Sequence, residues 1–145
     1  AAMILVGGRT AVEAARLGAV PPGAKPWNFI AIPFGDITTF AIFFLGAVIW
    51  RNDKDKHKRL MILASTCLMA AALVRWPGVL ALGALVSYVL MLAFPIAGAV
   101  YDRRSRGRVH PVYWWGLVLL VLGVAARVAL LGSPIWAHAM QSLFG

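Results

Sequence analysis

Long apolar runs constrain this chain more than any other feature of its sequence. Three of them, residues 29–50, 79–100 and 112–132, are each long enough to cross the hydrocarbon core of a bilayer as one helix, which takes about 20 residues. A fourth run, residues 57–76, reaches that length only if its charged first turn is included. Because irregular backbone cannot face lipid, each run is interpreted as a complete helix. The sequence therefore predicts an all-α fold: a polytopic transmembrane helical bundle with four spans, in a single domain over residues 1–145.

The two ends of the chain carry weaker signals than these runs. Residues 1–17 are apolar but include three charged side chains, so we expect either an interfacial helix or the outer part of a helix that begins before residue 1. The proline-rich segment 21–26 cannot continue a helix and separates this stretch from the first span. Residues 133–145 are expected to form a short tail that lies along the membrane interface.

Basic residues are concentrated in two of the predicted loops. Of the 14 Lys and Arg residues, five lie in residues 51–59 and four in residues 103–108. Two spans separate these clusters, so both lie on one face of the membrane, and their positive charge predicts that loops 51–59 and 101–111 are cytoplasmic. Neither cluster is interleaved with aromatic side chains that would stack on bases. Nucleic acid is therefore not expected as a partner, despite the net charge of +9.

The tryptophans support these helix boundaries independently. An indole ring is amphipathic and favours the level of the headgroups, between water and hydrocarbon. All six tryptophans lie within a few residues of a predicted helix end: Trp27, Trp50, Trp76, Trp114, Trp115 and Trp136.

Ionisable side chains inside predicted spans are the strongest indications of function in a membrane chain, because each is costly unless it meets water or a partner. Asp36 lies about two turns below the outer end of its span, and Arg127 lies at a comparable depth in the last span. Arg75 also approaches the outer surface. We predict an intramembrane polar network of Asp36, Arg75 and Arg127. It is either a site for a substrate or proton in a small transporter or channel, or a set of neutralising contacts that fixes helix register.

Two histidines suggest a second hypothesis, haem b binding. A b-type haem takes two neutral imidazoles from facing helices, and His57 and His110 lie at the cytoplasmic entrances of different helices. The alternative is that both are solvated histidines at the interface, because their surroundings are cationic and Pro111 follows His110. The sequence contains no compact ligand motif, so no metal site is expected.

Three runs of residues carry a resemblance to a known group of proteins. They are His57-Lys58-Arg59-Leu60-Met61, Arg75-Trp76-Pro77 and the run from Tyr101 to Pro111. They resemble a family of bacterial multi-helix membrane proteins of uncharacterised function, whose carboxy-terminal part this chain matches. The His-Lys-Arg-Leu-Met run is also similar to small membrane proteins linked to the assembly of haem-containing oxidases. The resemblance implies a helical protein of the bacterial cytoplasmic (inner) membrane.

These observations favour a non-catalytic integral membrane protein. No hydroxyl, thiol or carboxylate occurs in a nucleophile motif, so catalysis is not expected. The predicted partners are the lipid bilayer and other membrane protein subunits, on which the chain packs as an accessory or scaffold subunit. The alternatives are a redox or haem-handling membrane protein that uses His57 and His110, and a small transporter or channel that uses Asp36 and Arg127.

Overall fold

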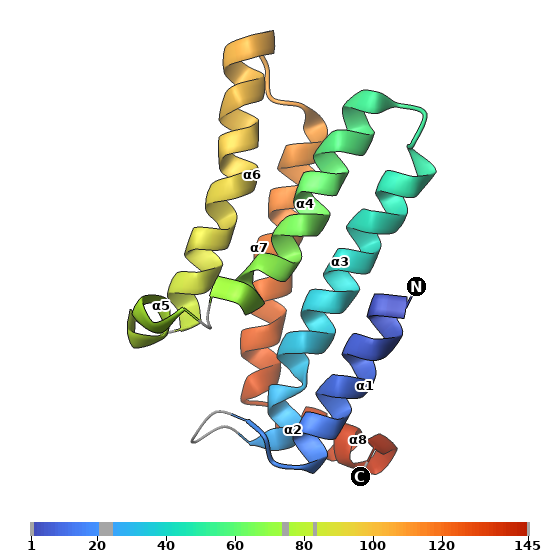
Figure 1. Cartoon of the computed structure of the whole chain (residues 1–145), viewed down its shortest axis with the longest axis vertical. Helices are drawn as coiled ribbons and strands as arrows, with labels where there is room; N and C mark the ends of the chain where they lie inside the picture. Colours follow the sequence, from blue (N-terminus) through green and yellow to red (C-terminus); the bar gives the residue numbers. More distant parts are fainter. Residues whose placement is uncertain (1, 21–24, 74–75, 83, 145) are drawn as a thin grey trace. The chain divides into compact units, whose positions relative to one another are not determined.

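The computed structural model describes residues 2–20, 25–73, 76–82 and 84–144, and within them every regular element is an α-helix. Six longer helices and two short ones follow one another along the chain (Figure 1). They are α1 (Ala2–Arg16), α2 (Pro26–Phe29), α3 (Ala31–Ile49), α4 (Lys54–Leu73), α5 (Pro77–Leu82), α6 (Ala84–Arg106), α7 (Pro111–Leu131) and α8 (Pro134–Phe144). Their contacts divide the chain into a first unit, residues 1–38 with 123–145, and a second unit, residues 39–122.

Local sequence explains where the helices begin and end. Four of them start with proline, whose missing N–H costs nothing at the first helical position: α2, α5, α7 and α8. The Oδ1 atom of Asp53 accepts the backbone N–H groups of Asp55 and Lys56, which caps the start of α4. Gly18 and Gly107 have φ angles of 64° and 72° and follow α1 and α6. Only glycine adopts this left-handed conformation without strain, so both helices end there.

The first unit has a small apolar core where three helices meet. Val12 and Ala15 of α1 pack with Ile30 and with Met140 of α8, and aromatic side chains surround this cluster. The Nε atom of Arg16 donates to the carbonyl of Phe144 at 2.8 Å, which holds α8 against α1. The predicted interfacial tail is therefore a helix.

The second unit is organised around α4 and α6, which make its most extensive helix–helix contact. The α7 helix approaches both of them at glycines. Gly116 lies against Leu63 of α4, and Gly98 of α6 lies against the ring of Tyr113. Small residues at these positions let the helices come close together, as is common between membrane helices.

Two of the predicted spans differ in position from the observed helices. The α4 helix begins three residues before residue 57, because Asp53 caps it at Lys54. The α6 helix continues six residues past residue 100, so the first half of the predicted loop 101–111 is helical. Asp102 is held against α4 by an ion pair described below, which favours continuation until Gly107 ends the helix.

Two helical stretches among the described residues are long and apolar enough to cross a membrane, rather than the four predicted. They are Pro26–Ile49 and Pro111–Leu131. In α4, the charged residues Lys56, Lys58 and Arg59 occupy the first turns and lower the hydropathy of the helix.

Replacing Gly116 with Ala tests the close approach of α7 to α4. Leu63 is completely buried, so the added methyl group crowds its side chain, and we expect a loss of about 1–3 kcal/mol in the free energy of unfolding. The matched control is Gly8→Ala in α1, where an added Cβ meets no atom within 4 Å. There the gain in helix propensity should stabilise the protein by roughly 0.5–1 kcal/mol. Thermal unfolding in mild detergent measures both, and equal effects of the two substitutions would contradict the packing described.

Candidate functional site

The predicted pair of Asp36 and Arg127 is brought together in the first unit. The Oδ1 atom of Asp36 lies 3.4 Å from the Nη1 atom of Arg127, and both residues are buried, with 5% and 4% of their surface exposed. Arg75, the third member of the predicted network, lies outside the described residues. The structure thus places two of the three predicted residues in one ion pair.

Gly35 makes room for this ion pair. A Cβ atom at Gly35 would lie 2.8 Å from Cγ and 2.9 Å from Cδ of Arg127, closer than non-bonded carbons approach. The arginine side chain therefore crosses the face of α3 over a residue that has no side chain of its own. The glycine at this position leaves the space through which the guanidinium group reaches Asp36.

The second unit contains a stronger ion pair that was not predicted from the sequence. Arg59 of α4 donates from Nε to Oδ2 of Asp102 and from Nη2 to Oδ1, both at 2.7 Å. Only 1% of Arg59 and 5% of Asp102 is exposed. Two parallel charge-assisted bonds give this contact a defined orientation as well as strength. The pair joins α4 to α6 at one end of the unit.

Asp55 forms ion pairs with further cations beside this pair. Both of its oxygens accept from Arg106 at 2.8 Å, and Oδ1 also lies 3.1 Å from Nζ of Lys58. The Arg106 guanidinium is the main cause that holds the pKa of Asp55 well below its usual range. The hydrogen bonds from Arg59 likewise lower the pKa of Asp102. Both carboxylates are therefore ionised at any physiological pH.

Arg59 and Asp102 lie in basic segments and in the runs that carry the resemblance, but no contact between them was predicted from the sequence. One signal was available: Asp102 is the only acidic residue after Asp55, and it directly precedes a run of arginines. A single carboxylate among cations indicates a specific partner. The identity of that partner depends on which helices pack together, which periodicity alone does not give.

The two histidines of the haem hypothesis use their ring nitrogens differently. The Nδ1 atom of His57 lies 2.8 Å from the carbonyl oxygen of Ala47, so it donates a hydrogen bond and leaves Nε2 unprotonated in the neutral ring. The Nδ1 atom of His110 instead accepts the backbone N–H of Val112 at 3.2 Å, which puts the proton of the neutral ring on Nε2. Iron binding through Nε2 needs the tautomer that His57 has. Among the described residues no group of three or more His, Cys, Asp or Glu side chains could hold a metal ion.

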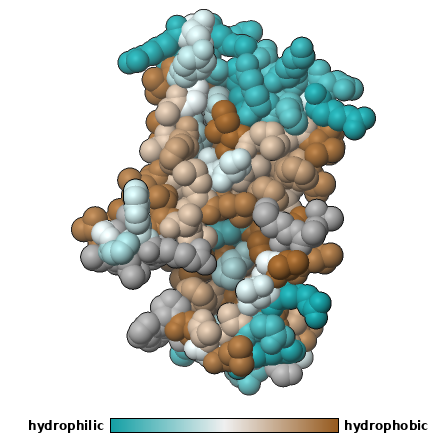
Figure 2. Space-filling model, viewed as in Figure 1, coloured by the Kyte–Doolittle hydropathy of each residue, from teal (hydrophilic) through white to brown (hydrophobic). Residues whose placement is uncertain are grey.

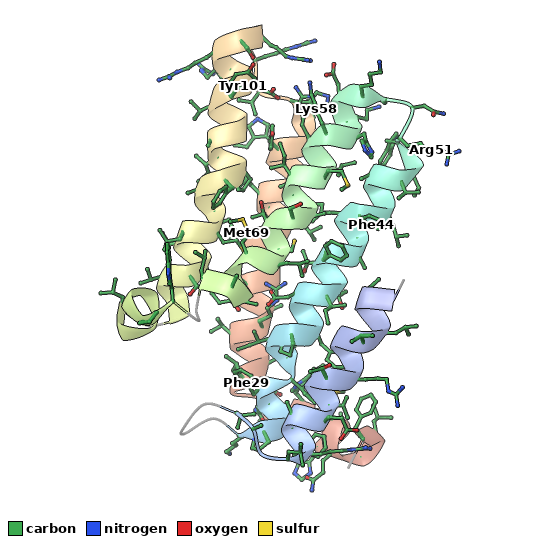
Figure 3. The ribbon with its side chains drawn as sticks, in the orientation of Figure 1. Phe29, Phe44, Arg51, Lys58, Met69 and Tyr101 are labelled. Atoms are coloured by element: carbon green, nitrogen blue, oxygen red, sulfur yellow. The ribbon has the colours of Figure 1, made fainter. Side chains whose placement is uncertain are left out.

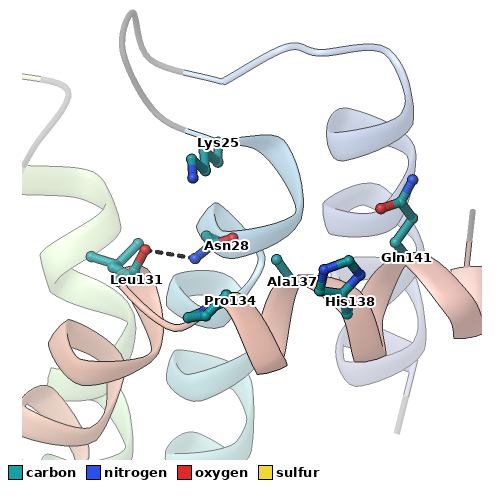
Figure 4. Close-up of a pocket in the computed structure, with 8 residues that line it drawn as sticks. Lys25, Asn28, Leu131, Pro134, Ala137, His138 and Gln141 are labelled. Carbon is teal, nitrogen blue, oxygen red and sulfur yellow. Dashed lines mark hydrogen bonds between the residues drawn. The ribbon is translucent and has the colours of Figure 1, made fainter.

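A cavity of about 630 Å³ lies in the first unit, at the end of α7 (Figure 4). Lys25, Asn28, His138 and Gln141 contribute polar groups to its wall. The Nδ2 atom of Asn28 donates to the carbonyls of Leu131 at 2.7 Å and Ser133 at 3.1 Å. Asn28 therefore satisfies carbonyl groups at the end of α7 that the helix itself leaves unpaired.

Comparisons with models of protein families, with curated proteins and with solved structures found no match. The resemblance to bacterial multi-helix membrane proteins stays a prediction. Function is therefore inferred from the arrangement of charged and apolar side chains.

Replacing Arg127 with Met tests what the pair with Asp36 does. The substitution leaves a buried carboxylate without its partner, and we expect it to destabilise the protein by about 3–5 kcal/mol. The double variant Asp36→Leu with Arg127→Met removes both charges and should recover most of that loss, because neither charge is then left alone. Thermal unfolding of each variant in detergent measures the effect. If the double variant is no more stable than Arg127→Met, the pair is not the source of the stabilisation.

The hydrogen bond that His110 accepts from Val112 at the start of α7, together with the burial of its ring, predicts a dependence of stability on pH. Burial lowers the pKa of His110 from its ordinary value of 6.5, so the folded protein favours the neutral ring. As the pH falls, His110 is protonated at a higher pH in the unfolded chain than in the folded protein. The free energy of unfolding therefore falls as the pH drops below about 6.5. His110→Asn keeps an oxygen that accepts from Val112 but does not titrate. We expect the decline between pH 7 and pH 5.5 to become shallower in this variant, as measured by thermal unfolding across that range; an unchanged decline would assign it to another group.

Proposed function

We propose that this chain is a four-span helical protein of a bacterial cytoplasmic membrane, where it acts as a non-catalytic accessory or scaffold subunit that packs against other membrane proteins. The observation that carries the proposal is the outward orientation of its large apolar side chains. Only 17% of the apolar stretch in α7 is buried, and only 28% of the stretch in Pro26–Ile49. A helix in the core of a soluble protein of this length would be mostly buried.

Both α6 and α7 expose rows of large apolar side chains. On α7 these include Val118, Val121 and Leu122, and on α6 they include Val89 and Phe94. Water contact would cost about 25 cal/mol for each Å² of this surface, whereas lipid tails or an apolar partner helix remove that cost. In the second unit, the hydrophilic side chains gather at the end where α3 meets α4 and α6 meets α7, with hydrophobic side chains beyond them (Figure 2).

In this topology, α4 and α6 cross the membrane as the second and third spans. Residues 84–101 of α6 contain no charged side chain, and this length is close to what a bilayer requires. In α4 the charges lie in the first turns, where Lys56 and Lys58 are partly exposed and Arg59 is neutralised by Asp102. Long cationic side chains at the end of a span extend towards the headgroups, which makes such positions tolerable.

The orientation follows from the positions of the basic residues. Arg51, Lys58 and Tyr101 lie at one end of the second unit, and Phe44 and Met69 lie further along its helices (Figure 3). Most Lys and Arg residues of that unit belong to this end. Cationic loops are retained in the cytoplasm during insertion, so we place this end there.

The ion pairs support a structural rather than a catalytic role. Each of the five acidic residues has a cationic partner: Glu13 with Arg16, Asp36 with Arg127, Asp53 with Lys56, Asp55 with three cations, and Asp102 with Arg59. A carboxylate whose pKa is lowered by such a partner, as in Asp55 and Asp102, is a weak general base. The pairs instead link neighbouring turns or neighbouring helices.

Labelling of two matched serines tests the proposed topology. Ser105 and Ser142 are both exposed, and each hydroxyl donates to a carbonyl of its own helix. In a background with Cys67→Ala, Ser142→Cys should react with a membrane-impermeant maleimide in intact spheroplasts. Ser105→Cys should react only after permeabilisation. The reverse pattern would contradict the orientation, and extraction of the protein from membranes at alkaline pH would contradict membrane spanning itself.

Crosslinking from an outward and an inward position tests the role as a subunit. Val118 is 47% exposed and Leu120 is 1% exposed, two residues apart on α7. A small diazirine amino acid at Val118 should give covalent adducts with other membrane proteins when irradiated in the native host. The same group at Leu120 should react only within the chain. Adducts with lipid alone from Val118, and equally from Val89 on α6, would contradict the proposed role.

A further inference from the structure

A groove of about 700 Å³ runs between α4 and α6 in the second unit. Its polar end is formed by Lys58, Ser105 and Arg106, beside the buried pair of Arg59 and Asp102. Its other end is lined by apolar side chains, which include Ile62, Phe94 and Ala97. The groove therefore changes from cationic to apolar along the direction of the helices.

We infer that this groove binds one anionic phospholipid, with the phosphate at Lys58 and Arg106 and an acyl chain along Ile62, Phe94 and Ala97. The inference rests on the proposed location in a membrane. In that location the polar end of the groove lies at the level of the cytoplasmic headgroups. Basic pockets between helices at this level are suited to anionic headgroups.

The charges at the polar end match a phosphodiester. Three cations and one carboxylate line the groove, and Asp55 beside it adds a second carboxylate, which leaves one positive charge in excess. A phosphodiester carries one negative charge. The bonds from Arg106 to Asp55 use Nη1 and Nη2, and Lys58 uses one ammonium hydrogen. The Nε–H of Arg106 and two hydrogens of Lys58 are not used by these bonds and are available to phosphate oxygens.

The apolar end of the groove distinguishes a lipid from a free anion. Phe94 precedes Ser105 by 11 residues on α6, which corresponds to roughly 16 Å along the helix. Ala97 lies between them and has a small side chain, so a slender apolar chain fits against the helix there. Inorganic phosphate has no apolar group that could contact this end of the groove. An occupant with both an anionic head and an apolar chain uses all of it.

The retention of phosphatidylglycerol by the purified protein tests this inference. Wild type is purified in a neutral detergent, supplied with equal amounts of phosphatidylglycerol and phosphatidylcholine, and examined by native mass spectrometry. We expect phosphatidylglycerol to be retained and phosphatidylcholine to be lost. The double variant Lys58→Gln with Arg106→Gln should bind phosphatidylglycerol on the order of 30-fold more weakly, since each cation near a phosphate contributes about 1 kcal/mol.

A matched pair of substitutions controls for overall charge. Lys54 and Arg104 lie on the same two helices but do not line the groove. Lys54→Gln with Arg104→Gln removes the same charge and should weaken binding by less than about threefold, because screening limits more distant charges. An equal loss in both double variants would overturn the inference, since the lipid would then be responding to net charge.

Filling the apolar end separates a lipid site from a phosphate site. Ala97→Trp keeps every charge and should abolish retention of phosphatidylglycerol. Ala99→Trp, which lies outside the groove, should leave retention unchanged. Retention by Ala97→Trp at the wild-type level, or displacement of the lipid by glycerol phosphate at equal concentration, would overturn the lipid assignment. Membrane insertion is scored separately by alkaline extraction, so a protein that inserts but retains no anionic lipid contradicts this inference and not the proposed function.

Discussion

A charged side chain that leaves water must find a partner, and this requirement shapes both units of the chain. The guanidinium of Arg59 is almost completely buried, and removal of Asp102 would leave it uncompensated. The bidentate contact also has a fixed geometry, because two parallel bonds allow only one mutual orientation of the groups. The register of α4 against α6 follows from that geometry. So does the groove between them, which the same two residues border.

The first unit meets the same requirement with a different arrangement. Asp36 and Arg127 make one contact of 3.4 Å instead of a fork, and the arginine reaches it by crossing Gly35. Any larger residue at Gly35 would displace the side chain of Arg127 before it altered the backbone. The pair therefore depends on a glycine that carries no charge itself. A search of the sequence for charged residues alone therefore finds Asp36 and Arg127 but misses the contribution of Gly35 to their geometry.

Much of the fold was predictable from the sequence, since apolar runs of spanning length give helices directly. The run 112–132 corresponds to α7 within one residue, and Asp36 and Arg127, which lie at comparable depth in their predicted spans, form an ion pair. Pattern reasoning was less accurate where side chains act across helices. The predicted loop 101–111 is helical up to Arg106, because Asp102 is anchored to a residue 43 positions earlier. The positive charge of the loops was already explained by the predicted membrane orientation. No specific partner was therefore predicted for Arg59 or Asp102.

The basic residues of the two clusters thus serve three physical purposes, which differ by burial and by partner. Arg59 is buried and paired with Asp102, so its charge contributes to the packing of α4 on α6. Arg106 is 43% exposed and lines the groove, so it retains donors for an external anion. Arg104 is exposed and lines neither cavity described above, so in the proposed topology we expect its charge to act at longer range, on the orientation of the chain. Counting arginines in a loop treats the three alike, whereas burial, partner and position in the groove separate them. Loss of stability, loss of bound lipid and altered topology are therefore expected from different residues of these two clusters.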